Sequence, residues 1–388
     1  MKRGESGYLW QQKGWPEMSW DSDALAAILA QVSREQGRLL GRMESLGFEL
    51  RREAQLSTLT EDVVRSSAIE GETLDSALVR SSIARRLGVD IGGGLRADRD
   101  VEGVVEMMLD ATTRYEKPLT ADRLFAWHAA LFPTGRSGMH KITVGNWRGD
   151  QTGPMQVVSG PIGKQQVHFE APPAARLPRE MDRFLAWFDS PGKRDPLLTA
   201  GLAHLWFVTI HPFDDGNGRI ARAIADMALA RSENNDQRFY SMSAQIRRER
   251  DDYYTMLERS QKATLDVTAW QEWFLHCLHR AIEASQDTLR EVLQKANFWK
   301  RFAEQPLNAR QLKVLNRLFD GFEGKLTTSK WAKLTKSSQD TAYRDILDLV
   351  ERGALQKDSA GGRSTSYSLV PDVDTRPSRS PRARSKPR

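Results

Sequence analysis

The stretch His211-Pro-Phe-Asp-Asp-Gly-Asn-Gly-Arg-Ile-Ala-Arg222 decides how this 388-residue chain is interpreted. The residues before it, 198–210, are almost entirely apolar and predict a buried helix. The residues after it, 220–230, are rich in Ala, Ile and Leu and predict a second helix. The stretch is therefore expected to be a loop held rigidly between two core helices.

This loop combines the residue types that bind phosphate. Gly216, Asn217 and Gly218 stand where the second helix should begin, so the backbone can approach an anion and offer free N–H groups. Arg219 and Arg222 are three residues apart and face the same side of that helix. Their guanidinium groups match phosphate oxygens, which suits the outer phosphates of a nucleotide.

Two further side chains of the loop suit reaction chemistry. Asp215 is a carboxylate that can hold Mg²⁺ together with phosphate oxygens, and His211 is a candidate general base. A lone His-Pro or Gly-Asn-Gly is typical of a helix end or a turn, but the combined spacing favours a site. We expect a hydroxyl, deprotonated by His211, to attack a phosphate of a bound nucleotide. The chain contains no Walker P-loop and no kinase signature set.

The stretch resembles the signature of the Fic family, H-P-F-x-[DE]-G-N-G-R-x-x-R, at every position. The resemblance implies a mainly helical fold with a small β-hairpin, and transfer of AMP from ATP to a Ser, Thr or Tyr hydroxyl of a target protein or of the chain itself. It implies His211 as the base and Asp215 as the Mg²⁺ ligand. It also implies that Asn217 and the loop amides hold the α-phosphate, while Arg219 and Arg222 hold the outer phosphates.

Other readings of the same loop stay open. Phe213 resembles a buried anchor, and Gly218 stands where phosphorylating relatives carry a lysine, which favours adenylyl transfer. Transfer of another nucleotide or of phosphocholine would need only a different base pocket and hairpin. A DNA-binding regulator that only senses nucleotide is a further alternative, although the presence of His211 argues against it.

A second motif, Ser66-Ser-Ala-Ile-Glu70-Gly71, resembles the inhibitory motif of the family, [ST]-x-x-x-E-[GN]. Residues 58–69 predict a helix that Gly71 ends, so Glu70 lies at the negative end of the helix dipole and needs a cation. The resemblance implies that Glu70 pairs with Arg222 and excludes the γ-phosphate, leaving Arg219 to the nucleotide alone. Alternatively Glu70 is an ordinary surface residue, or it supports removal of AMP as in some relatives.

Residues 145–148, 155–160 and 166–172 predict short extended runs, and with them the one convincing β-hairpin of the central region. The hairpin resembles the flap of the family, which pairs with the backbone of the target. This comparison points to Val157, Ser159 and Gly160, unless the hairpin is an inert surface feature.

The adenine side of the site is expected on a helix over residues 241–260. Tyr253 and Tyr254 fall where the family often has an aromatic pair near the base, and Gln261 follows at contact distance along the chain. Tyrosines on a helix are also typical of a packed core, so the two readings compete.

Composition limits the remaining possibilities. No apolar run is long enough to span a membrane and no secretory signal is visible, so a cytoplasmic protein is expected. Cys277 lies in an apolar helical pattern and is expected to be buried and inert. The net charge is +6, but residues 371–388 contribute six basic and two acidic side chains, or +4, which leaves +2 for the rest. Charge alone therefore argues little for nucleic-acid binding.

The pattern along the chain predicts five parts: a helical N-terminal extension (1–95), the catalytic core (96–290), a linker helix (291–305), a winged helix-turn-helix (306–370) and a disordered basic tail (371–388). The winged helix-turn-helix rests on predicted helices over 308–319, 327–334 and 338–352 and a two-stranded wing. This part is expected to bind either DNA or a protein partner. The resemblance to the family also implies that a homodimer can form. The residues expected to face a DNA groove are Ser337, Ser338, Gln339, Thr341, Arg344 and Arg363.

Overall fold

The computed structural model describes residues 7–91, 95, 97–151, 153–160, 164–190, 192, 194–319, 322, 324–358 and 365–370. It divides into two compact units, residues 1–288 and 289–388. Both are mainly helical, as predicted. Among the described residues no helix is both long and apolar enough to cross a membrane.

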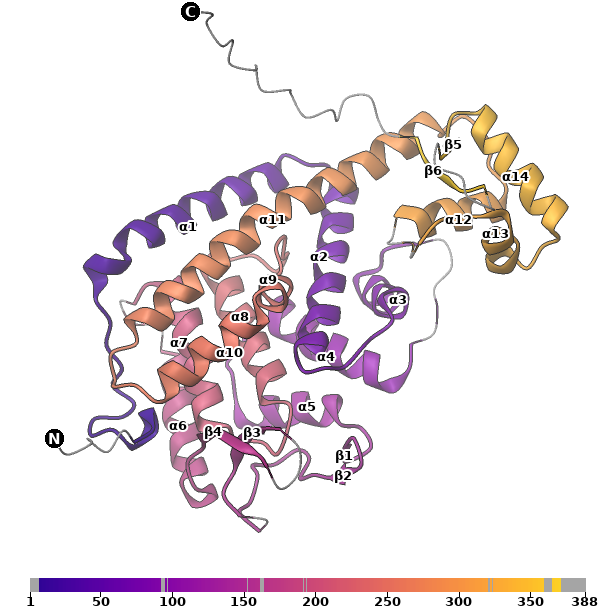
Figure 1. Cartoon of the computed structure of the whole chain (residues 1–388). Helices are drawn as coiled ribbons and strands as arrows, with labels where there is room; N and C mark the ends of the chain where they lie inside the picture. Colours follow the sequence, from indigo (N-terminus) through magenta and orange to yellow (C-terminus); the bar gives the residue numbers. More distant parts are fainter. Residues whose placement is uncertain are drawn as a thin grey trace, which may run out of the picture. The chain divides into compact units, whose positions relative to one another are not determined.

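A pair of helices, α7 (Pro196–Ile210) and α8 (Asn217–Glu233), forms the centre of the first unit, and their bounds lie within three residues of the predicted ones. Since α7 is apolar on every side, it has to be surrounded by other elements. Asp195 begins it by accepting hydrogen bonds from the N–H groups of Leu197 and Leu198. The other helices of the first unit, labelled in Figure 1, are α1 (Ser22–Glu44), α2 (Phe48–Ile69), α3 (Ser76–Leu87), α4 (Arg99–Thr113), α5 (Ala121–Leu131), α6 (Leu177–Phe188), α9 (Met242–Arg248), α10 (Arg250–Gln261) and the part of α11 (Thr268–Arg301) up to residue 288. Short 3-10 helices at Leu9–Gln11 and Ala174–Arg176 belong to the same unit.

Two expectations for the central region need correction. The helix predicted over 241–260 is interrupted at Glu249, whose carboxylate accepts two hydrogen bonds from Arg280 of α11. The predicted hairpin is present as β3 (Gln156–Ser159) and β4 (Gln166–Glu170), but residues 145–148 form no strand. A second, shorter antiparallel pair, β1 (Arg136–Ser137) and β2 (His140–Lys141), also lies in this region.

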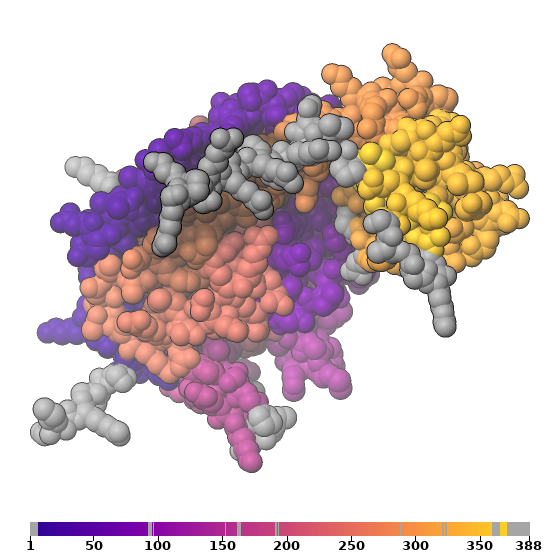
Figure 2. All heavy atoms as spheres, turned by 45° about the horizontal axis from the view of Figure 1, so that its top comes forward, coloured from indigo at the N-terminus to yellow at the C-terminus, as the bar shows by residue number. Residues whose placement is uncertain are grey.

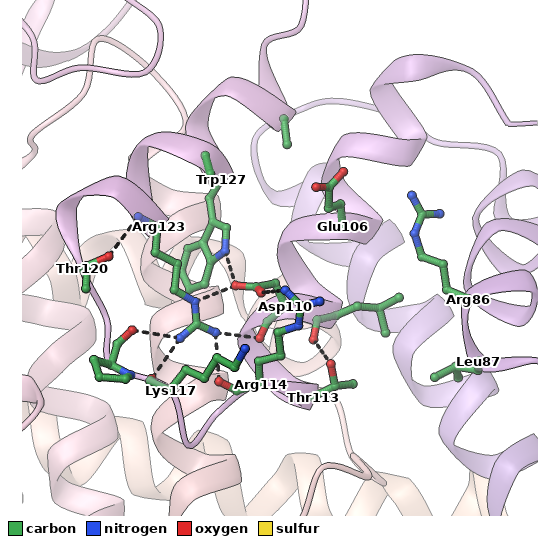
Figure 3. A pocket seen from close by; sticks show the side chains of 14 residues that line it. Arg86, Leu87, Glu106, Asp110, Thr113, Arg114, Lys117, Thr120, Arg123 and Trp127 are labelled. Atoms are coloured by element: carbon green, nitrogen blue, oxygen red, sulfur yellow. Dashed lines mark hydrogen bonds and ion pairs between the residues drawn. The ribbon is translucent and has the colours of Figure 1, made fainter.

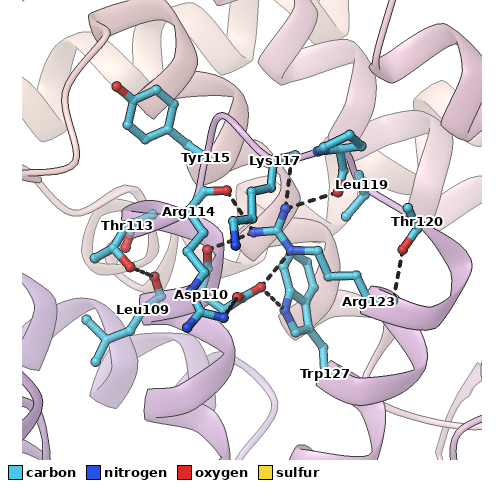
Figure 4. A network of polar contacts seen from close by, with 12 residues as sticks. Leu109, Asp110, Thr113, Arg114, Tyr115, Lys117, Leu119, Thr120, Arg123 and Trp127 are labelled. Carbon is cyan, nitrogen blue, oxygen red and sulfur yellow. Dashed lines mark hydrogen bonds and ion pairs between the residues drawn. The ribbon is translucent and has the colours of Figure 1, made fainter.

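The connection between α4 and α5 is held by Arg123. Its guanidinium group donates to the Asp110 carboxylate (Nε–Oδ2 2.6 Å) and to four backbone carbonyl groups, and Trp127 donates to the same carboxylate (Figure 4). The arginine forms part of the wall of a cavity of about 710 Å³ between α3, α4 and α5 (Figure 3). No residue of the His211–Arg222 stretch lines this cavity.

The second unit contains α12 (Ala309–Phe319), α13 (Thr328–Thr335) and α14 (Gln339–Glu351), followed by the antiparallel strands β5 (Leu355–Lys357) and β6 (Tyr367–Leu369). Trp331 and Ile346 are fully buried in its own core. This order of elements is the one expected for a winged helix-turn-helix, and that assignment stays a prediction. Arg363, the tip of the wing and the tail 371–388 lie outside the described residues.

Candidate active site

The signature loop is fixed by contacts within the core. His211 adopts a left-handed backbone conformation (φ 51°) at the end of α7, and Gly216 adopts another (φ 79°) just before α8. Phe213 is fully buried and stacks on His128, with the ring centroids 4.2 Å apart. The Asn217 side chain bonds both backbone groups of Phe213 (Oδ1–N 3.0 Å, Nδ2–O 2.8 Å). Asn217 therefore shapes the loop, and the free amides of the first turn of α8 remain for an anion.

His211 is neutral at physiological pH. Burial, opposed by the hydrogen bond to the Val208 carbonyl group and assisted by the charge of Arg148, lowers its pKa to about 4. Its Nδ1 lies 3.2 Å from the Val208 carbonyl oxygen, so Nδ1 donates and Nε2 keeps a free lone pair. An imidazole in this state can accept a proton, as a general base must.

Arg219 and Arg222 form a buried cationic pair at the start of α8; their side chains are 3% and 1% exposed. Neither Arg219 Nε nor Arg222 Nη1 has a hydrogen-bond partner among the described residues. Unpaired buried donors are costly, and a phosphate oxygen is the acceptor that suits a guanidinium group. These atoms therefore make the start of α8 a candidate anion site.

The contact between Glu70 and Arg222 that the sequence predicted is present in the structure, and its inhibitory role stays a prediction. Helix α2 ends at Ile69, Gly71 follows with φ 88°, and Glu70 Oε1 accepts a hydrogen bond from Arg222 Nη2 at 2.9 Å. Ser66 accepts two more bonds from the same guanidinium group, through Oγ and its carbonyl oxygen. Burial opposes the charge of Arg222, but the Glu70 carboxylate raises the pKa of this arginine.

Gly218 lies directly beneath the same carboxylate. A Cβ atom at this position would come within 2.3 Å of Glu70 Oε1, so a side chain there would displace the carboxylate from the position in which it contacts Arg222.

A second carboxylate, missed from the sequence, pairs with the other arginine. Glu72 Oε2 accepts a hydrogen bond from Arg219 Nη1 at 2.6 Å. The expectation that Arg219 is left to the nucleotide alone is therefore wrong for this structure. The chain turns after Gly71 and brings Glu72 to Arg219, a path that the motif does not specify.

Asp215, the expected Mg²⁺ ligand, lies near the end of the loop and is half-buried. Its Oδ1 accepts from the Gly216 N–H at 2.5 Å, and its Oδ2 accepts from the Ser137 hydroxyl. Within the described residues no three His, Cys, Asp or Glu side chains gather as a metal site. A single carboxylate fits Mg²⁺ only where phosphate oxygens and water complete the coordination.

The three residues expected near adenine differ in accessibility. Tyr253 is buried and its hydroxyl bonds His204 (2.9 Å), while the buried Gln261 amide donates to the Val208 carbonyl oxygen (3.2 Å). Both therefore support the core. Tyr254 is half-buried, with its hydroxyl 3.4 Å from Glu70 Oε2. Contact of any of the three with adenine stays a prediction.

Arg148 connects the candidate base to the β3–β4 hairpin. Its side chain is completely buried; Nε donates to the His211 carbonyl oxygen (2.7 Å) and Nη2 to the Pro172 carbonyl oxygen beyond β4 (2.6 Å). A left-handed conformation costs a residue other than glycine about 1–2 kcal/mol. A charge-assisted hydrogen bond contributes about 1.5–3 kcal/mol, enough to offset it.

We expect Arg148→Met to lower the turnover rate by about 10–100-fold, because a displaced His211 no longer reaches the reacting hydroxyl. Arg123→Met is the matched control, since it also removes a well-bonded arginine but one that holds α4 and α5 (Figure 4). Both variants should lose stability in urea unfolding, and only Arg148→Met should lose turnover. Equal turnover in the two variants would contradict the role given to Arg148.

Acid should destabilise the protein through its buried histidines. Burial lowers the pKa of His128 and His211 to about 4 and that of His204 to about 3, against 6.5 in the unfolded chain. Between these values the unfolded state binds more protons, so the free energy of unfolding falls as pH drops from 6.5 towards 4. The full loss is roughly 3 kcal/mol for His211. Urea unfolding at several pH values measures it, and His128→Asn should make the pH dependence shallower.

The rigid loop between two core helices, with its neutral histidine and two buried arginines, is an arrangement that suits phosphate binding. Residues 118–229 match the Fic/DOC family, and residues 8–89 match a domain of unknown function, DUF4172. The chain therefore contains a Fic/DOC family domain, and its mainly helical fold agrees with that family.

The chain is also similar to named relatives and, in its fold, to a solved structure. The protein adenylyltransferase Fic of Nematostella vectensis is 26% identical over 228 residues, covering 57% of this chain and 47% of the relative. The protein adenylyltransferase fic-1 of Caenorhabditis briggsae is 27% identical over 172 residues, covering 44% and 31%. The chain thus spans about half or less of these relatives. A Fic family protein from Desulfovibrio desulfuricans has the same fold (TM-score 0.52, 22% identity, 90% of this chain and 97% of that chain covered).

Proposed function

We propose that the chain is a protein adenylyltransferase, which transfers AMP from ATP to a Ser, Thr or Tyr hydroxyl and is restrained by Glu70. The observation that carries the proposal is the neutral His211 imidazole beside two buried arginines with unpaired N–H donors. The names of the relatives support adenylyl transfer in particular.

The reaction follows from the placement of these groups. The target hydroxyl oxygen attacks the α-phosphorus, His211 Nε2 takes the hydroxyl proton, and the bond to the departing pyrophosphate breaks. The first amides of α8 hold the α-phosphate, and Arg219 and Arg222 hold the outer phosphates once Glu70 and Glu72 release them. Asp215 would hold Mg²⁺, which neutralises phosphate charge when it is bound.

The β3–β4 hairpin has a free edge that suits recognition of the target. Val158 and Val167 are exposed, at 39% and 40%, although both lie in a paired strand. The part of the chain coloured magenta, which includes β3, stands out at the lower edge of Figure 2. A target strand can add to such an edge through its backbone, with Val157, Ser159 and Gly160 beside it.

The test uses α-³²P-ATP and γ-³²P-ATP with Mg²⁺, a cell extract as the source of targets, and three proteins: the natural chain, Glu70→Gly and Glu70→Gly/His211→Ala. Label on extract proteins is expected from α-³²P-ATP only, strongest with Glu70→Gly and absent when His211 is also replaced. Label from γ-³²P-ATP would indicate a kinase. No label with any of several nucleotides would contradict transferase activity.

A second candidate function, DNA binding, rests on the exposed face of α14. Ser338, Gln339 and Arg344 are exposed there, but so are Tyr343 (48%) and Leu347 (44%), which suit a protein partner instead. Duplex binding by the full chain should fall with Gln339→Ala/Arg344→Ala if DNA is the ligand. Binding unchanged by the double substitution would remove this candidate.

A further inference from the structure

Helices α2 and α8 pack along a seam that includes the proposed inhibitory contact. Near one end of this seam, Gly218 lies beneath the Glu70 carboxylate. One turn further along, Ser66 accepts two hydrogen bonds from Arg222, through Oγ and through its carbonyl oxygen, both at 2.9 Å. The residue number falls by four on α2 and rises by four on α8, which is the pattern of an antiparallel helix pair with one contact at each turn.

The next contact of the same seam joins two carboxyl groups. Asp62 of α2 and Asp226 of α8 lie one turn further along, and their side chains are in hydrogen-bonding contact. Both residues are buried, with exposed fractions of 4% and 3%. The Oδ2 atom of each finds no hydrogen-bond donor among the described residues. Since an ionised carboxylate only accepts, two carboxyl groups in contact are satisfied when one proton is held between them.

The groups around the two aspartates favour the protonated state. Arg238 donates to Asp226 Oδ1 at 3.2 Å and to Glu233 Oε2 at 3.1 Å, so this guanidinium group is shared between two of three buried carboxyl groups. Other donors around them are neutral: the Ser241 hydroxyl and the Ser243 N–H at Asp62, and the Tyr240 hydroxyl and the Gln36 amide at Glu233. Burial first, and then the charge of Asp62, raise the pKa of Asp226 well above its ordinary value. The pair therefore keeps a proton at a pH where an exposed aspartate is ionised.

We propose that Asp62 and Asp226 share one proton, and that this proton keeps α2 in the position in which Glu70 pairs with Arg222. The inference rests on the proposed function, in which that pairing keeps ATP from Arg222. Loss of the proton leaves two carboxylates in contact, and buried like charges repel. The packed seam binds the proton, whereas separated carboxylates in water do not. The packed seam is therefore favoured at low pH and is lost as pH rises through the raised pKa of the pair.

Asparagine imitates the protonated side chain at either position. In Asp62→Asn and in Asp226→Asn, Oδ1 still accepts its present hydrogen bonds, while the amide N–H donates to the facing carboxylate. Each variant therefore holds the seam together at every pH. Glu61→Gln is the matched control, because it makes the same change from carboxylate to amide at the neighbouring residue of α2, which pairs with Arg65 instead.

The experiment measures the affinity of the full chain for a non-hydrolysable ATP analogue with Mg²⁺ by calorimetric titration, from about pH 6 to about pH 9, a range that raised carboxyl pKa values reach. Glu70→Gly is measured alongside. The ratio of its affinity to that of the natural chain reports the Glu70–Arg222 contact and cancels the titration of ATP itself. This ratio should fall as pH rises, by up to about tenfold per pH unit, the limit for one linked proton. The same ratio should keep its low-pH value for Asp62→Asn and Asp226→Asn, and should follow the natural chain for Glu61→Gln.

Infrared spectroscopy detects the shared proton without any nucleotide. At neutral pH the natural chain should show the carbonyl band of a protonated carboxyl group, which both asparagine variants lose and Glu61→Gln keeps. Absence of this band overturns the inference, and so does a ratio of affinities that is independent of pH; the proposed function stands in both cases. If Glu70→Gly binds the analogue no more tightly than the natural chain at low pH, the proposed restraint by Glu70 fails, and this inference fails with it.

Discussion

The double substitution Glu70→Gly/Glu72→Gln is expected to give the largest gain in ATP binding and AMP transfer of any change to this chain. Each carboxylate forms an ion pair with one of the two arginines that we propose to bind the outer phosphates of ATP, so it competes with ATP for that arginine. Arg222 is buried, and its charge-assisted bond to Glu70 is of the kind that contributes about 1.5–3 kcal/mol. Glu72 is 46% exposed, so screening limits its contact with Arg219 to about 1 kcal/mol or less.

These contributions predict how much each variant gains in ATP affinity. Glu70→Gly alone should tighten ATP binding by about 10–100-fold, Glu72→Gln alone by up to about fivefold, and the double substitution by more than either. Calorimetric titration with a non-hydrolysable ATP analogue measures the affinities. Glu61→Gln is the matched control, because Glu61 also lies on α2 and pairs with an arginine, Arg65, away from the site. No gain from Glu72→Gln in the Glu70→Gly background would show that only Glu70 competes with ATP.

The second large effect, a loss of AMP transfer, is expected when the candidate general base His211 is replaced. In the Glu70→Gly background, His211→Ala should lower AMP transfer to extract proteins by about 10²–10⁴-fold, the range that general base catalysis supplies. ATP affinity should change little, because the arginines and the amides of α8 remain. His140→Ala, at an exposed histidine of β2, serves as the control.

The pH dependence checks the same assignment. Because the pKa of His211 is about 4, the rate should stay constant from neutral pH down to about 5 and fall as pH passes through about 4. A rate that falls below pH 7 with an ordinary histidine pKa would place the proton acceptor elsewhere. Equal rates with and without His211 would have the same meaning.

Local sequence was sufficient to predict the helices whose composition marks them clearly. Helices α7 and α8 were predicted to within a few residues because an apolar segment and a glycine-rich start mark them. The Glu70–Arg222 contact was predicted from the resemblance of two short motifs. The candidate anion site could also be predicted from local sequence, because its residues, Gly216 to Arg222, are neighbours in the chain.

Long-range contacts account for what was missed. Glu72 contacts Arg219 after the turn at Gly71, and Glu249, where the helix breaks, bonds Arg280 from another helix. Arg148 bonds His211, 63 residues away in the sequence, and His168 of β4 bonds Glu258 of α10, 90 residues away. Periodicity and motif spacing carry no information on such pairs.

The most direct test of the central claim is the stoichiometry of ATP use by Glu70→Gly with Mg²⁺ and extract proteins. Adenylyl transfer predicts one pyrophosphate released for each AMP attached to protein, with both amounts rising together. Release of orthophosphate, or consumption of ATP with no AMP on any protein, would contradict the assignment of the His211–Arg222 loop as an adenylyl-transfer site.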